Sequence, residues 1–128
     1  MSIQTEASAA AAHALAERYI AAWNETDATR RSELVAAAFA PEVRYQDPMM
    51  EGEGHDGIGA LIAGVQQRFA GHRFALHGTP DAHHGVVRFS WALGLPEAAP
   101  VARGTDVAVL DDAGRLRQVT GFLDYLAG

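Results

Sequence analysis

The stretch "VRYQDPMMEGEG", residues 43–54, decides how this sequence is interpreted. Val43 and Tyr45 alternate with polar residues, as in a β-strand with one apolar and one solvated face. By this alternation Asp47 lies on the apolar side, and Pro48 ends the strand directly after it. Asp before Pro is also a common turn former, whose carboxylate holds a neighbouring backbone N–H. A role in a buried site requires polar partners for Asp47 from elsewhere in the sequence.

The composition is typical of one globular domain spanning residues 1–128, with 48% hydrophobic and 20% charged residues. The net charge of −6 and the scattered basic residues argue against a nucleic-acid partner. The absence of cysteine excludes disulfides and thiolate metal sites, and it fits a cytoplasmic location. No signal-peptide pattern and no apolar run of ~20 residues is present, so we expect no membrane partner.

Apolar residues at helical spacing predict three helices, at about residues 5–23, 28–40 and 57–70. Asp27 or Thr29 is the candidate cap of the second helix, and Asp56 that of the third. A strand is expected at residues 42–47.

Four longer β-rich segments follow, at residues 73–79, 84–95, 101–110 and 115–125, and the turn sequences "PDAH", "PEAAP" and "DDAG" separate them. Helices followed by a strand meander predict an α+β domain, with helices on one face of a mainly antiparallel sheet.

Both faces of this sheet carry apolar residues. In one strand Val107 and Val109 point to one face of the sheet, and Ala108 and Leu110 point to the other. Helices can cover only one face, so we expect a second copy of the protein to cover the other, giving a homodimer. The alternative is a mildly apolar face exposed to solvent.

Two further polar side chains point towards the apolar interior. Asp106 lies within a strand, where Asp is disfavoured, and its neighbours on the same face are the small residues Gly104 and Ala108. Tyr19 lies in the apolar stripe of the first helix with Trp23. Asp106 as a solvated edge charge and Tyr19 as plain core are the structural alternatives. Together with Asp47, these groups could satisfy one another at one site.

The runs "ERYIAAWNETD", "LVAAAFAPEVRYQDP", "EGHDGIGALIAGV" and "GTDVAVLDDAGRLRQVTGFLD" resemble the nuclear transport factor 2-like superfamily, in particular its SnoaL-like and ketosteroid isomerase-like branch. The resemblance extends from about residue 8 to 126. It implies a cone-shaped fold, in which three helices pack on a strongly curved sheet that encloses a pocket. It also implies frequent dimers through the sheet.

The ketosteroid isomerase pattern implies roles for three residues. Asp47 matches the general base before Pro, which removes a proton next to a carbonyl. Tyr19, in "RYIAA", matches one donor to the resulting dienolate oxygen. Asp106 matches the second donor, which in that enzyme is a carboxyl kept protonated by an apolar site. No cofactor is needed for this chemistry, so we expect none.

The predicted pocket walls are apolar, which favours a flat hydrophobic carbonyl compound as ligand or substrate. Trp23, Phe39, Met49 and Phe69 are the expected walls, and Gly104 and Ala108 leave space beside Asp106. The acidic residues 51 and 53 follow Asp47 closely and are expected to disfavour a large anionic ligand.

Other functions fit the same resemblance. The limonene epoxide hydrolase branch fits worse, because Gly104 stands where that branch has Arg. Polyketide cyclases and dehydratases stay open, with Asp124, His72 or His77 as candidate acid–base groups. A non-catalytic ligand-binding dimer is a further alternative. The six histidines form no metal-ligand spacing, so we expect no metal site.

Overall fold

A computed structural model describes the backbone of residues 3–128 and the side chains of residues 9–128. It contains the helices α1 (Ile3–Asn24), α2 (Ala28–Ala38) and α3 (Gly54–Arg68). The strands are β1 (Phe39–Gln46), β2 (Glu51–Glu53), β3 (Arg73–His83), β4 (Val86–Gly94), β5 (Ala102–Leu110) and β6 (Leu116–Leu126). The helices lie in the first 68 residues and most strands follow them, which confirms the predicted α+β class.

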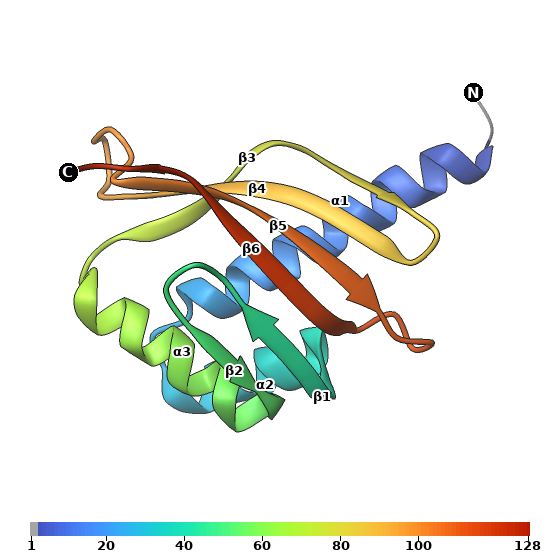
Figure 1. Cartoon of the computed structure of the whole chain (residues 1–128), viewed down its shortest axis with the longest axis horizontal. Coiled ribbons are helices and arrows are strands. Elements are labelled where there is room, and N and C mark those ends of the chain that lie inside the picture. The colour runs from blue at the N-terminus through green and yellow to red at the C-terminus, as the bar shows by residue number, and fades with distance from the viewer. Residues whose placement is uncertain (1–2) are drawn as a thin grey trace.

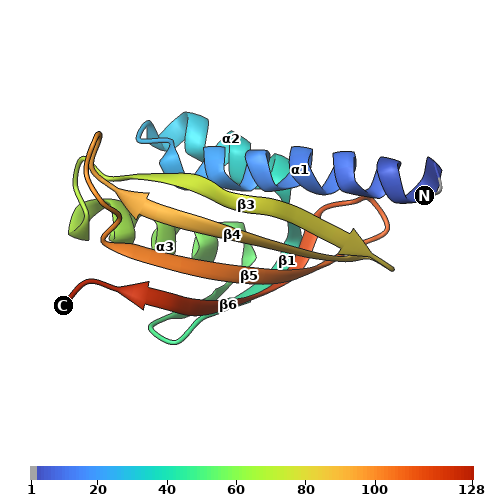
Figure 2. The ribbon, with the colours of Figure 1, turned by 90° about the horizontal axis from the view of Figure 1, so that it is seen from above.

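The six strands form one curved sheet in the order β2-β1-β6-β5-β4-β3. All neighbours are antiparallel except β1 and β6, which run parallel. Figure 1 shows the β3–β6 meander arching over α1, with α2 and α3 below it, and Figure 2 shows α1 running alongside β3. One sheet face is therefore concave and packed by helices, and the other is left without a helix.

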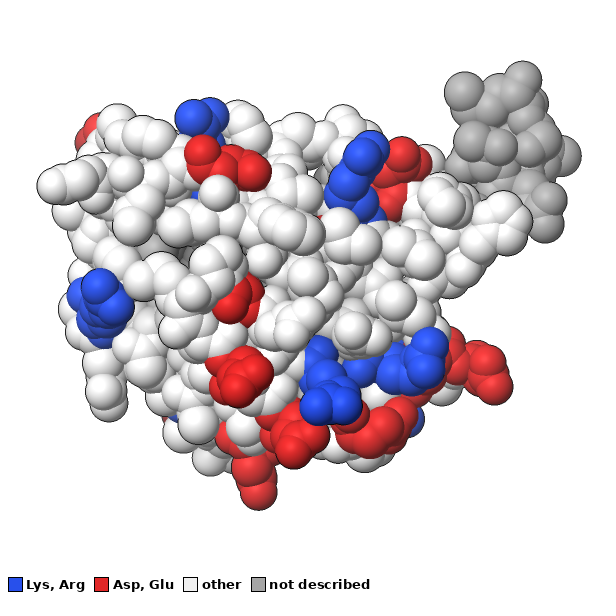
Figure 3. Space-filling model, in the orientation of Figure 1, with Lys and Arg blue, Asp and Glu red and all other residues white. Residues whose placement is uncertain are grey.

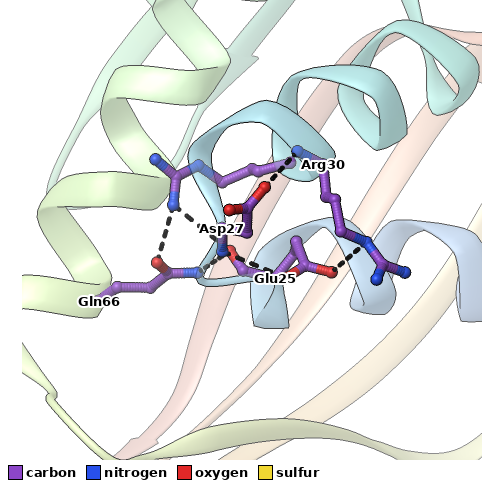
Figure 4. Close-up of polar contacts among 5 residues, drawn as sticks. Glu25, Asp27, Arg30 and Gln66 are labelled. Carbon is purple, nitrogen blue, oxygen red and sulfur yellow. Dashed lines mark hydrogen bonds and ion pairs between the residues drawn. The ribbon is translucent and has the colours of Figure 1, made fainter.

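Polar contacts fix the end of α1 against α3 (Figure 4). The side-chain amide of Gln66 in α3 donates to the backbone carbonyls of Trp23 at 3.0 Å and Glu25 at 2.8 Å. Asp27 caps α2, since its carboxylate accepts the backbone N–H of Arg30 at 2.9 Å, and it was one of the two predicted caps. These contacts fix the position of Trp23 relative to α3, so that both border the same interior space.

Several predicted boundaries were wrong. β3 continues through the expected turn "PDAH", because it is an edge strand in which Pro80 needs no pairing N–H. Gly78, with φ of +79°, lies in the register shift that accommodates this continuation. Phe39 begins β1 and does not end α2, and Asp56 lies in the first turn of α3, not at its cap.

The acidic segment after Asp47, expected as loop, contains β2, which pairs with the end of β1. Its Glu51 and Glu53 side chains are exposed. Within residues 3–128, no helix is both long and apolar enough to cross a bilayer.

Candidate active site

β1 brings Tyr45 and Asp47 to the interior side of the sheet. Val43 and Tyr45 are buried, while Arg44 and Gln46 are exposed, as the alternation predicts. The Asp47 carboxylate accepts three hydrogen bonds: Oδ1 from the backbone N–H groups of Met49 (2.8 Å) and Met50 (2.9 Å), and Oδ2 from the Tyr45 hydroxyl (2.6 Å). Asp47 is thus both a turn former and an oriented carboxylate, and the two interpretations are compatible.

β5 places Asp106 in the interior. It pairs with Phe89 of β4 and Gly121 of β6, and only 2% of its surface is exposed. Among residues 9–128 it is the one charged side chain that is buried. The hydroxyl of Tyr19 in α1 donates to Asp106 Oδ2 at 2.7 Å. This hydrogen bond joins residues 87 positions apart in the sequence.

Burial changes the proton affinity of this cluster. It raises the pKa of Asp106 to about 6, although the Tyr19 hydroxyl and the Trp91 indole N–H favour the ionised form and oppose the rise. Burial, and then the charge of Asp106, raises the pKa of Tyr19 well above its usual value. The pKa of Tyr45 is raised for the same two reasons, and its hydrogen bond to Asp47 adds to the rise. Both phenols therefore stay protonated donors.

Gly121 lies between the two phenol–carboxylate pairs. A Cβ atom built on Gly121 would lie 2.8 Å from Asp106 Oδ1 and 3.1 Å from Asp47 Cβ. Since both distances start from one point, these two atoms are at most about 6 Å apart. The same point is 3.6 Å from the Tyr45 hydroxyl oxygen. A glycine here allows both carboxylates to reach the same end of one cavity.

This cavity has a volume of about 320 Å³. Tyr19, Tyr45, Asp47 and Asp106 all line it. Three of the predicted wall residues also line it: Trp23, Met49 and Phe69. Its other apolar lining residues include Met50, Val65, Phe74, Trp91, Leu93, Leu123 and Leu126. The structure therefore joins a polar end to a mainly aromatic and aliphatic interior.

The other three predicted wall residues do not line the cavity, and this part of the interpretation is corrected. Phe39 and Ala108 are fully buried in the core. Gly104 leaves space that the indole of Trp91 fills, because a Cβ on Gly104 would lie 2.6 Å from Trp91 Cε2. Trp91 is the cross-strand partner of Gly104. Its side chain occupies the space that Gly104 was expected to leave open, and it lines the cavity there.

The sequence interpretation missed Tyr45, Trp91 and Gly121. Tyr45 carried a usable signal, because it lies two residues before Asp47 and therefore on the same face of the strand. Trp91 and Gly121 carried none, because their roles depend on which residues they meet across the sheet.

The alternative acid–base candidates lie outside the cavity lining. Asp124 accepts a hydrogen bond from Thr105 at 2.6 Å, and His72 contacts the backbone carbonyls of residues 69 and 70. His77 is exposed on β3. In the part of the protein that the structure describes, no group of three or more acidic or histidine side chains could hold a metal ion.

Comparisons with known proteins agree with this architecture. A solved structure of a candidate isomerase of the SnoaL-like family from Agrobacterium tumefaciens strain C58 is 51% identical. The match covers 88% of this chain and 97% of that chain, with a TM-score of 0.84. Among curated proteins, none matches this sequence.

Two more distant structures share the fold. An NTF2-like protein of unknown function from Exiguobacterium sp. 255-15 is 19% identical over 86% of this chain and 98% of its own, with a TM-score of 0.68. A candidate polyketide cyclase from Sinorhizobium meliloti is 17% identical over 84% of this chain and 92% of its own, with a TM-score of 0.64.

A family model described as "SnoaL-like domain" matches residues 16–119, which include Tyr19, Asp47 and Asp106. With the curved sheet over three helices, this match confirms the resemblance drawn from the sequence. The chain belongs to the SnoaL-like domain family and has the NTF2-like fold.

Proposed function

We propose that the protein is a cofactor-independent enzyme that moves a proton on a hydrophobic carbonyl compound, as ketosteroid isomerase-like enzymes do. One observation carries this proposal: two phenol–carboxylate pairs, Tyr19–Asp106 and Tyr45–Asp47, meet at one end of an apolar cavity. The 51% identical candidate isomerase supports the same class of reaction.

In the proposed reaction, the Asp47 carboxylate removes a proton from the carbon next to the carbonyl. The electron pair of that C–H bond moves into the conjugated system, and the carbonyl becomes a dienolate. Asp47 then returns the proton to the far carbon of the dienolate, and the carbonyl is restored. A positioned base of this kind contributes roughly 10²–10⁴ to the rate.

The dienolate oxygen needs donors, and Asp106 is suited to be one when it is protonated. Its Oδ2 accepts from Tyr19, while its Oδ1 faces Gly121 and the Asp47 side. A proton on Oδ1 would point towards the reacting end of the ligand. Tyr19 is then the second donor or the group that orients Asp106. Each donor to a developing oxyanion is worth roughly 10²–10³ in rate.

A second candidate is a cyclase-type or dehydratase-type enzyme in which Asp106 itself is the base. The observation that favours it is the direction of the Tyr19 hydrogen bond, which a carboxylate accepts. A pKa of about 6 also leaves Asp106 largely ionised at neutral pH. If substitution of neither Asp47 nor Asp106 changes turnover, the remaining interpretation is a ligand-binding dimer that catalyses no reaction.

The test of the proposal is the variant Asp47→Asn with Glu51→Gln as matched control, since Glu51 lies nearby but does not line the cavity. Conversion of cyclohex-3-enone to the conjugated enone is followed by ultraviolet absorbance. We expect Asp47→Asn to lose about 10²–10⁴ in kcat. The control should match the wild type, and both variants should keep its melting temperature. Full activity in Asp47→Asn would remove it as the base.

The pH profile separates the two candidates. If Asp106 acts as a protonated donor, kcat/KM falls as pH rises through the pKa of about 6. If Asp106 is the base, kcat/KM rises through the same region. The Asp106→Asn variant should lose this transition in either case.

A further inference from the structure

Among the described residues that line the cavity there is one cation, Arg68, in the last turn of α3. The other charged residues in this described lining are Asp47 and Asp106. The Arg68 guanidinium lies 5.7 Å from the ring centroid of Phe69, which is itself a cavity wall. No described carboxylate forms an ion pair with it; the five ion pairs among residues 9–128 involve other cations.

The end of α3 that carries Arg68 lies near the end of β4, which pairs with the start of β5, and Asp106 lies further along β5. Gly71, three residues beyond Arg68, packs near Leu95, since a Cβ on Gly71 would be 3.6 Å from Leu95 Cδ2. Leu95 follows the end of β4, where Leu93 pairs with Ala102. Figure 1 shows the C-terminal end of α3 at the same end of the molecule as the β4–β5 connection and the C-terminus of the protein.

The length of the cavity follows from β5. Ala102 and Asp106 both line it and lie four residues apart on one strand face. At about 3.3 Å per residue, they are ~13 Å apart. The lining between them is apolar on the facing elements, including Phe69, Phe74 and Trp91. This length suits a molecule of two or three fused rings.

The acidic residues that were expected to repel an anion do not line this cavity. Glu51 and Glu53 are exposed on β2. The Glu53 carboxylate forms an ion pair with Arg44, with 3.9 Å between Glu53 Oε2 and Arg44 Nε. In Figure 3 acidic and basic side chains both gather along the lower edge, and a separate basic side chain lies at the left, over the C-terminal end of α3. Solvent screens exposed charges beyond about 8 Å.

We propose that the ligand carries a carboxylate, which Arg68 binds while the carbonyl end reaches Asp47 and Asp106. This inference rests on the proposed function, because that function places the carbonyl group at Asp47 and Asp106. The ionised Asp47 carboxylate would repel an anionic group beside it, so the charge determines the orientation as well. The ligand class is therefore a flat, unsaturated or aromatic keto acid.

The test uses isothermal titration calorimetry at pH 7 with two probes of equal ring size: 6-hydroxy-2-naphthoic acid and its methyl ester. We expect the wild type to bind the acid about fivefold more tightly, the upper end for an exposed ion pair, because Arg68 is exposed. Arg68→Met should abolish this preference by weakening the acid alone, and Arg68→Lys should keep part of it. Added salt should weaken only the acid.

Arg117→Met is the matched control, because Arg117 is exposed on β6 and does not line the cavity. It should bind both probes as the wild type does. Equal binding of acid and ester by the wild type would overturn the inference. A preference that survives Arg68→Met, or no binding of either probe, would overturn it as well. The proposed function fails separately, if Asp47→Asn keeps full turnover while the Arg68-dependent preference persists.

Discussion

Each carboxylate of the site is held by a phenol, but the two pairs differ in their surroundings. Asp106 is almost fully buried, and burial dominates its proton affinity. Asp47 lies at a turn, where two backbone N–H groups and Tyr45 fix its orientation. Such a pair of environments can separate the roles of two chemically identical side chains.

Tyr45→Phe tests whether the phenol positions Asp47, the proposed base. The variant removes the 2.6 Å hydrogen bond to Asp47 but keeps the buried ring. We expect kcat to fall about tenfold, as for a lost hydrogen bond to a charged group, with little change in KM. Tyr125→Phe, at an exposed position, should leave both constants unchanged. An unchanged kcat in Tyr45→Phe would mean that the two backbone donors suffice.

Asp106 should also make stability depend on pH. Its pKa rises from 3.8 in the unfolded state to about 6 in the folded one, so the native state binds more protons between these values. Stability therefore falls as pH rises through this window and levels off above it. The loss is up to about 3 kcal/mol at 1.36 kcal/mol per pKa unit.

Asp106→Asn removes this titration while keeping an acceptor for Tyr19. Melting temperatures of both proteins are compared between pH 4 and 7. The melting temperature of the variant minus that of the wild type should increase as pH rises to about 6. Above that pH the difference should stay constant. A difference that is independent of pH would contradict the raised pKa.

At the scale of elements, local patterns predicted which faces of α1, β1 and β5 point inward. Helical and strand periodicities are properties of neighbouring residues, so Tyr19, Asp47 and Asp106 could be assigned to interior faces from the sequence. The pairing of β2 with β1 and the continuation of β3 past Pro80 could not be predicted, because they depend on sheet edges and register.

The cavity walls were harder to predict than the polar residues. A residue on the inner face of the sheet lines a cavity only where neighbouring side chains do not cover it. Gly104 faces inward, yet the Trp91 indole from the adjacent strand occupies its space, and Phe39 is covered completely. These outcomes depend on side-chain volumes from several elements, which no local pattern contains.

Gly104→Ala tests the close packing between β4 and β5. The new Cβ would lie 2.6 Å from Trp91 Cε2 and 2.8 Å from the Phe122 carbonyl oxygen, so both the ring and the β6 backbone must move. We expect a loss of about 1–3 kcal/mol in urea denaturation and a weaker fit of cavity ligands.

Gly59→Ala is the matched control in α3, where a Cβ would have no atom within 4 Å. It should raise stability by up to about 1 kcal/mol, because glycine is unfavourable within a helix. Equal stability of Gly104→Ala and the wild type would show that Trp91 repacks without strain.

For the whole molecule, the sheet face without helices is partly apolar. Val107 and Val109 are half-buried there, and Phe122 and Tyr125 of β6 are 55% and 42% exposed. We propose that a second copy of the protein covers this face, as expected from the sequence.

Light scattering after size-exclusion chromatography should then give twice the mass of one protomer. Val107→Lys should shift the protein to the monomer, since it places a charge on the covered face. Ala36→Lys, at an exposed position of α2, should not. A monomeric wild type would contradict the proposed dimer.

The hydrogen bond between Tyr19 and Asp106 has a consequence for how the site assembles. It joins the first helix to the penultimate strand, so neither half of the sequence holds the complete proposed catalytic group. Contacts between such distant segments form only after the intervening residues have closed into a loop. Catalytic turnover would thus be lost together with global structure during denaturation, and a fragment that ends before β5 would be inert however well its helices formed.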